Sequence, residues 1–214
     1  MARPRTFDED TVLDAAIGGF REFGYEATSM RDLARRMGLA APSLYNAFGD
    51  KRALFERALT RYADRSMRAR IREIEAAYGP VEAIGVFFDG IIRRSIEDPD
   101  RRGCMIVNSA LEVAPHDPEL AVVIGRYIDE IRAFFRRNIA AAQQSGAAPA
   151  DLDAGETASL LLGVLLGIRV LARAKPDREL LEAVVRPALS LLSSPTPNRE
   201  RHDRSLLLDH AQRS

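Results

Sequence analysis

The chain has 214 residues with 46% hydrophobic and 29% charged side chains, and its 31 basic residues balance its 31 acidic residues. This composition is typical of a soluble globular protein with a substantial core, and the zero net charge excludes a polycation that coats DNA by charge alone. The single cysteine, Cys104, excludes an intramolecular disulfide; with no signal peptide and no apolar stretch as long as the roughly 20 residues of a membrane span, a soluble cytoplasmic protein is expected.

Apolar residues recur at helical spacing along nearly the whole chain, and no segment alternates with a period of two. The predicted fold class is therefore all-α, with about nine helices. Glycine, proline and aspartate residues lie in the breaks between the helices. The predicted helices span residues 8–23, 28–37, 41–48, 51–78, 81–96, 103–113, 118–144, 152–174 and 177–192.

The first strong break after the early helices is Gly79-Pro80, which we take as the domain boundary. Residues 1–52 form the predicted N-terminal domain, and the helix 51–78 connects it to a second domain at 79–192. Residues 193–214 begin with Ser-Ser-Pro-Thr-Pro-Asn and continue with many charges, which predicts a disordered tail.

Two short helices, 28–37 and 41–48, are separated by a turn that contains Gly38, which is the form of a helix-turn-helix. The start of the second helix can enter the major groove of DNA. Residues 29–52 carry five basic and two acidic side chains, as a phosphate-binding surface requires. From these residues alone, DNA binding and simple helical packing with solvated charges remain equally open.

The same segment resembles the N-terminal signature of the TetR/AcrR transcriptional regulators. The matching positions are Phe23-Gly24-Tyr25, Thr28, Leu33-Ala34, Gly38-Leu39, Leu44-Tyr45, Phe48-Gly49-Asp50-Lys51 and Leu54. The resemblance covers about residues 8–60 and fades beyond them. It implies an all-helical homodimer that binds operator DNA through the helix-turn-helix and responds to a small molecule through residues 79–192.

By this resemblance, Thr28 and Lys51 hold phosphates and Tyr45 lies against the DNA backbone at the groove edge. Arg3 and Arg5, which precede the first helix, form a flexible arm that could reach phosphates or a minor groove. The positions facing bases are Arg31, Ala41, Pro42, Ser43 and Asn46. Two departures stand out: Ala40 replaces the usual serine or threonine cap of the recognition helix, and Ala47 replaces a common contact residue. Few hydrogen-bonding groups remain, so DNA shape and methyl contacts are expected to contribute to recognition.

The last two predicted helices carry more apolar residues than one buried face requires. Gly163 and Gly167, four residues apart, would let another helix approach closely. The resemblance implies a four-helix dimer interface here, and the alternative is that these residues are the core of the monomer. The predicted interface residues are Leu160, Leu161, Gly163, Val164, Gly167, Ile168, Leu171, Leu181, Val184, Val185 and Ala188.

An effector pocket is predicted among apolar side chains of residues 79–192, although each of them also fits ordinary core packing. The predicted pocket residues are Phe87, Phe88, Ile91, Cys104, Met105, Asn108, Glu112, Tyr127, Phe134 and Phe135. Cys104 begins a predicted helix beside Arg101 and Arg102, which favours a thiolate. The run Gly-Cys-Met-Ile-Val-Asn resembles a segment in a subset of the family, some of whose members sense electrophiles, so Cys104 is either such a sensor or an inert thiol.

Other functions fit the sequence less well. An enzyme would need a nucleophile beside a base or a metal cluster, but His116, His202 and His210 have no metal-ligand spacing, and no phosphate-binding glycine loop is present. We therefore expect no enzyme activity, no cofactor and no metal. A DNA-binding dimeric scaffold without a small-molecule ligand remains open. In the favoured mechanism, an unidentified effector swings the helix 51–78 and moves the recognition helices apart.

Overall fold

The computed structural model describes residues 7–193, and every regular element within them is helical. Arg3, Arg5 and nearly all of the expected tail lie outside the described residues. The elements are α1 (Glu9–Phe23), α2 (Met30–Arg36), α3 (Ala41–Phe48), α4 (Lys51–Ala63), the π-helical turn η1 (Asp64–Arg68), α5 (Ala69–Ala77), α6 (Pro80–Ile96), α7 (Met105–Glu112), α8 (Pro118–Gln144), α9 (Ala154–Ala174) and α10 (Arg178–Ser190). Because α4, η1 and α5 follow one another directly, the prediction of about nine helices is confirmed for this part of the chain.

Capping residues explain where several helices begin. The carboxylate of Asp8 accepts a hydrogen bond from the Thr11 amide at the start of α1, and the Ser29 hydroxyl accepts one from Asp32 at the start of α2. Ala40 at the start of α3 makes no such side-chain bond. Pro42 lies in the first turn of α3, where its fixed φ angle favours the helical conformation, so proline partly replaces the missing cap.

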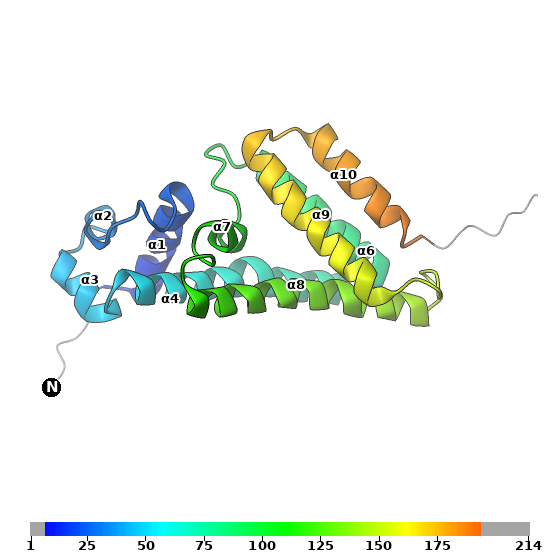
Figure 1. Cartoon of the computed structure of the whole chain (residues 1–214), viewed down its shortest axis with the longest axis horizontal. Helices are drawn as coiled ribbons and strands as arrows, with labels where there is room; N and C mark the ends of the chain where they lie inside the picture. Colours follow the sequence, from blue (N-terminus) through cyan, green and yellow to red (C-terminus); the bar gives the residue numbers. More distant parts are fainter. Residues whose placement is uncertain (1–6, 194–214) are drawn as a thin grey trace, which may run out of the picture.

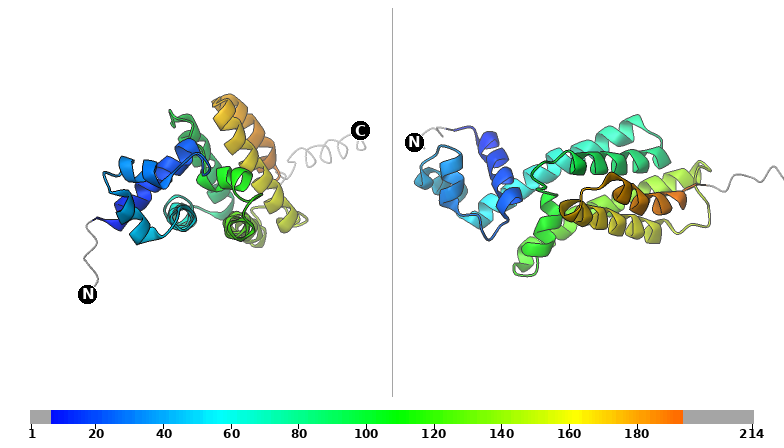
Figure 2. Two further views of the ribbon diagram at one scale, coloured as in Figure 1. Left: turned by 60° about the vertical axis from the view of Figure 1, so that its left-hand side comes forward. Right: turned by 90° about the horizontal axis from the view of Figure 1, so that it is seen from above.

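The molecule is elongated, with α1, α2 and α3 at one end (Figure 1). The continuous rod of α4, η1 and α5 leads away from them, and α6 packs against α5, α8, α9 and α10. Seen from above, α9 and α10 lie side by side on one face (Figure 2, right). The loop that leads into α7, and α7 itself, contact α1 and α4, so they join the two ends of the molecule.

Four phenylalanines from two helices form the centre of the C-terminal core. Phe87 and Phe88 come from α6, and Phe134 and Phe135 come from α8. The ring centroids of Phe87 and Phe134 are 5.1 Å apart, and those of Phe88 and Phe135 are 5.5 Å apart in a stacked arrangement. Aromatic pairs at these separations stabilise a core beyond their buried area.

The helix α9 is long and apolar enough to resemble a membrane span, although no such stretch was expected from the sequence. By length and composition Ala154–Ala174 could cross a membrane, although only 33% of its most apolar window is buried. The core helix of a soluble protein passes the same test, and α9 packs against α6, α8 and α10. Packing in the core therefore does not account for the apolar residues on the exposed side of α9, which are described below.

Candidate functional site

The helices α2 and α3 are held by a tight contact with α1. Leu33 and Ala34 of α2 and Leu44 of α3 are buried, as the helix-turn-helix pattern predicts. A Cβ atom on Gly19 of α1 would lie only 2.7 Å from Cδ2 of Leu33. Glycine at this position therefore lets α2 approach α1 closely, which fixes how α3 is presented to the solvent.

One face of this unit carries exposed polar side chains without intramolecular partners. Arg31 at the start of α2 and Pro42, Tyr45 and Asn46 on α3 are exposed. Tyr45 has 46% of its surface accessible although it is aromatic. The side chains of Arg31, Tyr45 and Asn46 make no hydrogen bond or ion pair to the described residues. Ala41 and Ser43 are half-buried beside them.

Two predicted phosphate contacts are turned inward. Thr28 is 4% exposed, and its hydroxyl donates a hydrogen bond of 2.6 Å to the Gly24 carbonyl. The Lys51 ammonium donates to the Tyr25 carbonyl at 3.1 Å and lies 4.3 Å from the centroid of the Tyr25 ring. Both side chains thus hold the loop between α1 and α2, and their contact with phosphate stays a prediction.

Most of the positive charge counted between residues 29 and 52 is paired. Arg36 forms two hydrogen bonds with Glu22, of 2.9 and 3.2 Å, and Arg35 pairs with Asp32 at 3.0 Å. Arg52 pairs with Asp117 and Glu119, each at 2.7 Å. Arg31 is thus the arginine of this segment without an ionic partner among residues 7–193, which increases its expected weight in DNA binding.

Three contacts connect the N-terminal region to α7 and to the loops on either side of it. Arg21 of α1 donates hydrogen bonds of 3.0 and 2.6 Å to the Gly103 carbonyl. The Glu26 amide donates to Glu112 Oε1 at 2.8 Å, and the same carboxylate leaves no room for a Cβ atom on Gly24, whose φ is +85°. Arg52 binds Asp117. A displacement of α7 would therefore act directly on α1 and α4.

The Arg52–Asp117 contact predicts a measurable pKa. Arg52 Nε lies 2.7 Å from Asp117 Oδ2, and this hydrogen bond lowers the pKa of Asp117 from its ordinary 3.8 to about 2. Because the folded-state pKa is depressed, the contact contributes stability above pH 4 and loses it as the pH falls toward 2. In Arg52→Gln the pKa of Asp117 should return toward 3.8, as carboxyl NMR titration will show. An unchanged pKa would contradict the contact.

The predicted dimer residues fall into two groups. Leu161 and Ile168 of α9 and Leu181, Val185 and Ala188 of α10 are at most 5% exposed within one chain, so they are core residues of the monomer. This corrects their assignment to an interface: α9 packs against α6 and α8, and α10 packs against α6 and α9. Leu160 and Gly163 are exposed on the outer side of α9, while Gly167, Val164, Leu171 and Val184 are half-buried.

The outer side of α9 forms an apolar stripe that the monomer leaves uncovered. Leu160 and Val170 are 48% and 49% exposed, and they lie on the same side of α9 as Gly163 and Gly167. A Cβ atom built on either glycine would meet nothing within 4 Å. The stripe is therefore flat and open, and it accounts for the apolar composition of α9.

The predicted aromatic pocket is filled by its own side chains. An apolar cavity of only about 40 Å³ remains, and of the predicted residues Phe87, Ile91 and Cys104 line it. Ligand pockets usually have about 300–1,000 Å³. The pocket prediction was wrong for Phe88, Phe134 and Phe135, because the four phenylalanines pack against one another and leave only the small cavity beside Phe87. Phe88, Met105, Tyr127, Phe134 and Phe135 are core residues.

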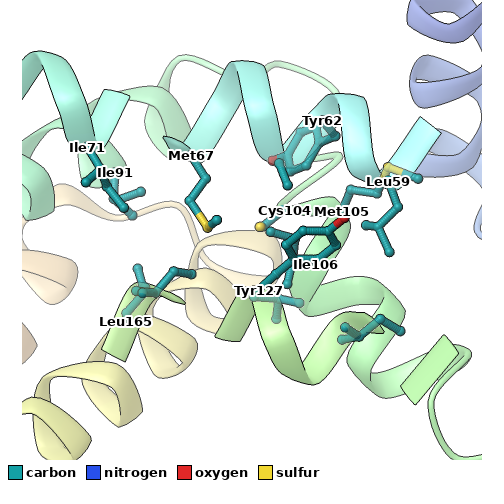
Figure 3. Packing of buried hydrophobic residues seen from close by; sticks show 14 of the residues in the cluster. Leu59, Tyr62, Met67, Ile71, Ile91, Cys104, Met105, Ile106, Tyr127 and Leu165 are labelled. Atoms are coloured by element: carbon teal, nitrogen blue, oxygen red, sulfur yellow. The ribbon is translucent and has the colours of Figure 1, made fainter. Parts of the chain in front are cut away.

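The two polar groups predicted for that pocket lie elsewhere. Glu112 makes the contact with Glu26 described above. Asn108 donates to the Arg102 carbonyl at 2.9 Å and accepts from Arg173 at 3.1 Å. Cys104 is 9% exposed and lies near Tyr62 and Met67 of the connecting helix (Figure 3). Burial and the neighbouring Cys104 thiol raise the pKa of the Tyr62 hydroxyl.

Sequence reasoning missed a larger cleft of about 320 Å³, which we call the arginine cleft. It lies where α1, η1, α5, α6, α9 and the loop before α7 come together. Its lining residues are far apart in the sequence, from Arg21 to Arg173, so no local pattern announced it. The only feature of the sequence that could have indicated this cleft is the high density of arginines between residues 61 and 72.

The comparisons with known proteins agree with this fold. Residues 12–58 match the bacterial regulatory proteins of the tetR family, and residues 80–188 match the Tetracyclin repressor-like C-terminal domain. The uncharacterised HTH-type transcriptional regulator YezE of Bacillus subtilis is 36% identical over 90% of this chain and 100% of its own length. The transcriptional repressor ComR of Escherichia coli is 29% identical over 88% of this chain and 90% of its own length.

A solved structure extends the similarity to a DNA complex. The TetR family regulator CifR, crystallised as a cysteine mutant with 26-base-pair double-strand operator DNA, superposes with a TM-score of 0.79 at 34% identity. The match covers 88% of this chain and 98% of that chain. The helix-turn-helix with its exposed face, the helical C-terminal region and these matches over both regions agree: the chain belongs to the TetR family of DNA-binding transcriptional regulators.

Proposed function

We propose that this regulator is a repressor that binds a palindromic operator as a homodimer and is released by a small molecule. The observation that carries the DNA-binding part is the exposed face of Arg31, Tyr45 and Asn46, which have no partner among the described residues. In this proposal residues 1–52 bind DNA, and residues 79–192 form the dimer and bind the effector. The helix of residues 51–78 connects these two domains. Relatives such as ComR are themselves named repressors, which supports repression rather than activation.

The apolar stripe on α9 supports the dimer. Exposed leucine and valine beside two open glycines form a surface against which the same surface of a second chain can pack around a two-fold axis. A dimer of this kind presents two recognition helices, which on DNA must lie about 34–36 Å apart to enter successive major grooves. The spacing of the two α3 helices therefore controls operator affinity.

The contacts around α7 supply a route from effector to DNA. Arg21 of α1 and Arg52 of α4 bind the loops before and after α7, and Glu112 of α7 binds the loop between α1 and α2. An effector that binds more tightly to a conformer with α7 displaced would shift α1 and α4, and thereby the spacing of the α3 helices. By thermodynamic linkage, operator DNA lowers the affinity for such an effector by the same factor.

A DNA footprinting experiment tests the proposal. Purified protein is expected to protect an inverted repeat in the DNA that flanks its own gene, with one half-site per protomer. Adding the physiological effector should remove the protection without dissociating the dimer. If an intact dimer protects no inverted repeat there, the repressor function is wrong. If protection appears but no small molecule changes it, the chain is a DNA-binding scaffold.

A thiol-based sensor is the second candidate function, because Cys104 lines the apolar cavity beside Tyr62 and Ile91. Cys104→Ser is expected to bind the operator as the native chain does but to lose any release by thiol-modifying electrophiles. The readout is operator affinity before and after treatment with such a reagent, with mass spectrometry to locate the adduct. If the serine variant and the native chain are released equally, Cys104 is an inert core thiol.

A further inference from the structure

The arginine cleft carries far more positive than negative charge. Seven of its thirteen lining residues are arginines, and the one acidic residue is Asp98. The arginines come from α1, η1, α5, α6, α9 and the loop before α7, so the fold brings them together from six segments. At about 320 Å³ the space suits a small molecule, in contrast to the cavity of about 40 Å³ beside Cys104.

Some of these arginines are already engaged. Arg65 donates to Asp14 at 2.6 Å, and Arg173 donates to the Asn108 side chain at 3.1 Å. Arg169 has only a long contact of 3.3 Å with the Ser95 hydroxyl. Asp98 lies 3.5 Å from both Arg21 and Arg102, so its one negative charge is shared at the edge of the cleft.

Arg70 and Arg94 differ from the engaged arginines because they have buried donor atoms without partners. Nε of Arg70 and Nη1 of Arg94 are buried and have no hydrogen-bond partner. Both guanidinium groups lie against Gly90: a Cβ atom there would be 2.8 Å from Arg70 Nη2 and 3.1 Å from Arg94 Nη1. Gly90 thus makes room for two like charges side by side, an arrangement that costs free energy unless an anion neutralises it.

The protonation of Arg94 reflects the same crowding. Burial lowers the pKa of Arg94 to about 10, with further lowering by the positive charges of Arg70 and Arg169. Guanidinium groups normally stay charged far above this range, and their planar donors match phosphate and carboxylate oxygens. A bound anion would give the buried donors partners and would remove the repulsion between Arg70 and Arg94.

We propose that the arginine cleft binds a small multiply charged anion, a phosphorylated or polycarboxylate molecule, through Arg70, Arg94 and Arg169, and that this anion is the effector. The second half of this inference rests on the proposed function. The anion-binding half rests on the cleft alone. An apolar effector is disfavoured, because the apolar cavity has no room for one.

The position of the cleft suits a regulatory site. Arg21 reaches it from α1 of the helix-turn-helix and also binds the Gly103 carbonyl in front of α7. Arg65 and Ser66 reach it from η1, the π-helical turn in the middle of the connecting helix, and such turns often occur at functional sites. Arg169 reaches it from α9, the helix with the apolar stripe. An anion here would contact the DNA-binding, connecting and dimerising elements together.

Calorimetric titration of the full-length dimer with pyrophosphate and with citrate tests the binding. Sodium chloride at equal ionic strength is the control, and comparison of the two probes separates phosphate from carboxylate recognition. At about 100 times its Kd, the better anion should raise the Tm by roughly 5–10 °C. If neither anion binds beyond the chloride control, the proposal is overturned.

Substitutions place the site. Arg94→Met is expected to weaken anion binding at least tenfold and to raise the Tm of the anion-free protein, because a buried unpaired charge is removed. Arg136→Met, the same change at an exposed position on α8, should alter neither. If Arg94→Met fails to fold, Arg70→Gln serves the same purpose. Equal anion binding by the native chain and a folded cleft variant would overturn the proposal.

Measurements of operator binding at constant ionic strength test the effector role separately from anion binding. The anion should lower operator affinity at least tenfold in the native chain and much less in Arg94→Met. If the anion binds but leaves operator affinity unchanged, the effector role is overturned and the anion site stands. If Arg94→Met weakens operator binding without any added anion, the cleft contacts DNA phosphates and the proposal is wrong. If no operator is bound at all, the repressor function fails, while calorimetry still decides the cleft.

Discussion

Gly167→Leu is expected to convert the dimer into monomers and to lower operator affinity roughly 100-fold or more, because a monomer holds only one half-site. A Cβ atom at Gly167 meets nothing within 4 Å in the monomer, so a larger side chain can leave the backbone there without a clash at its first carbon. In the proposed dimer it would, however, separate the two α9 helices along the stripe. Leucine also favours the helix over glycine by about 1 kcal/mol, so the monomer should keep its fold.

A matched control exists in α8. Gly125 is likewise inside a helix and has nothing within 4 Å of a built Cβ atom, but it lies away from the stripe. Gly125→Leu should gain the same helix propensity and stay dimeric. Sedimentation velocity gives the oligomeric state, and gel-shift titration gives the operator affinity. If Gly167→Leu remains a dimer of native affinity, the α9 stripe is not the interface.

Arg31→Ala is expected to lower operator affinity roughly 30-fold or more. Removing one base contact typically costs about 1–3 kcal/mol, and the dimer loses this contact in both half-sites. The neighbouring arginines offer no replacement, because Arg35 binds Asp32 and Arg36 binds Glu22. Arg31 itself supports no described contact within the protein, so the stability of the fold should not change.

Discrimination between operator and unrelated DNA is the decisive measurement for Arg31. If Arg31 contacts a base, the variant loses affinity for the operator and keeps most of its non-specific binding. If Arg31 contacts a phosphate, both affinities fall and the salt dependence becomes shallower. Arg136→Ala, at an exposed position on α8, controls for the loss of a positive charge. Native operator affinity in Arg31→Ala would remove Arg31 from the DNA interface.

The N-terminal region could be predicted closely because its determinants are local. Asp8, Ser29 and Asp50 cap α1, α2 and α4 through bonds to residues three positions ahead, so these caps and the apolar spacing define the N-terminal helices. The missing cap at Ala40 was also visible in the sequence, and the structure shows the same absence. The π-helical turn at Asp64–Arg68 was not visible, because its five residues read as ordinary helix.

The C-terminal region, residues 79–192, could not be predicted in the same way, because its determinants join residues far apart in the chain. The four phenylalanines that were predicted to line a pocket fill the core instead. Whether such rings pack together or enclose a pocket depends on their relative orientation, which the sequence does not give. Leu161 and Leu160 are adjacent and chemically identical, yet one is buried and the other is 48% exposed. Which side of α9 faces the core depends on how α6, α8 and α10 pack.

The sequence by itself determined the helical fold class, the helix-turn-helix and the apolar excess of the last two helices, since periodicity, caps and composition act within a few residues. Only the tertiary structure decided which apolar residues are core and which form a stripe. It also placed Arg52 on Asp117 and brought Arg70, Arg94 and Arg169 into one cleft. Charges separated by about a hundred residues interact only after folding has brought them within a few ångströms, where burial strengthens the interaction.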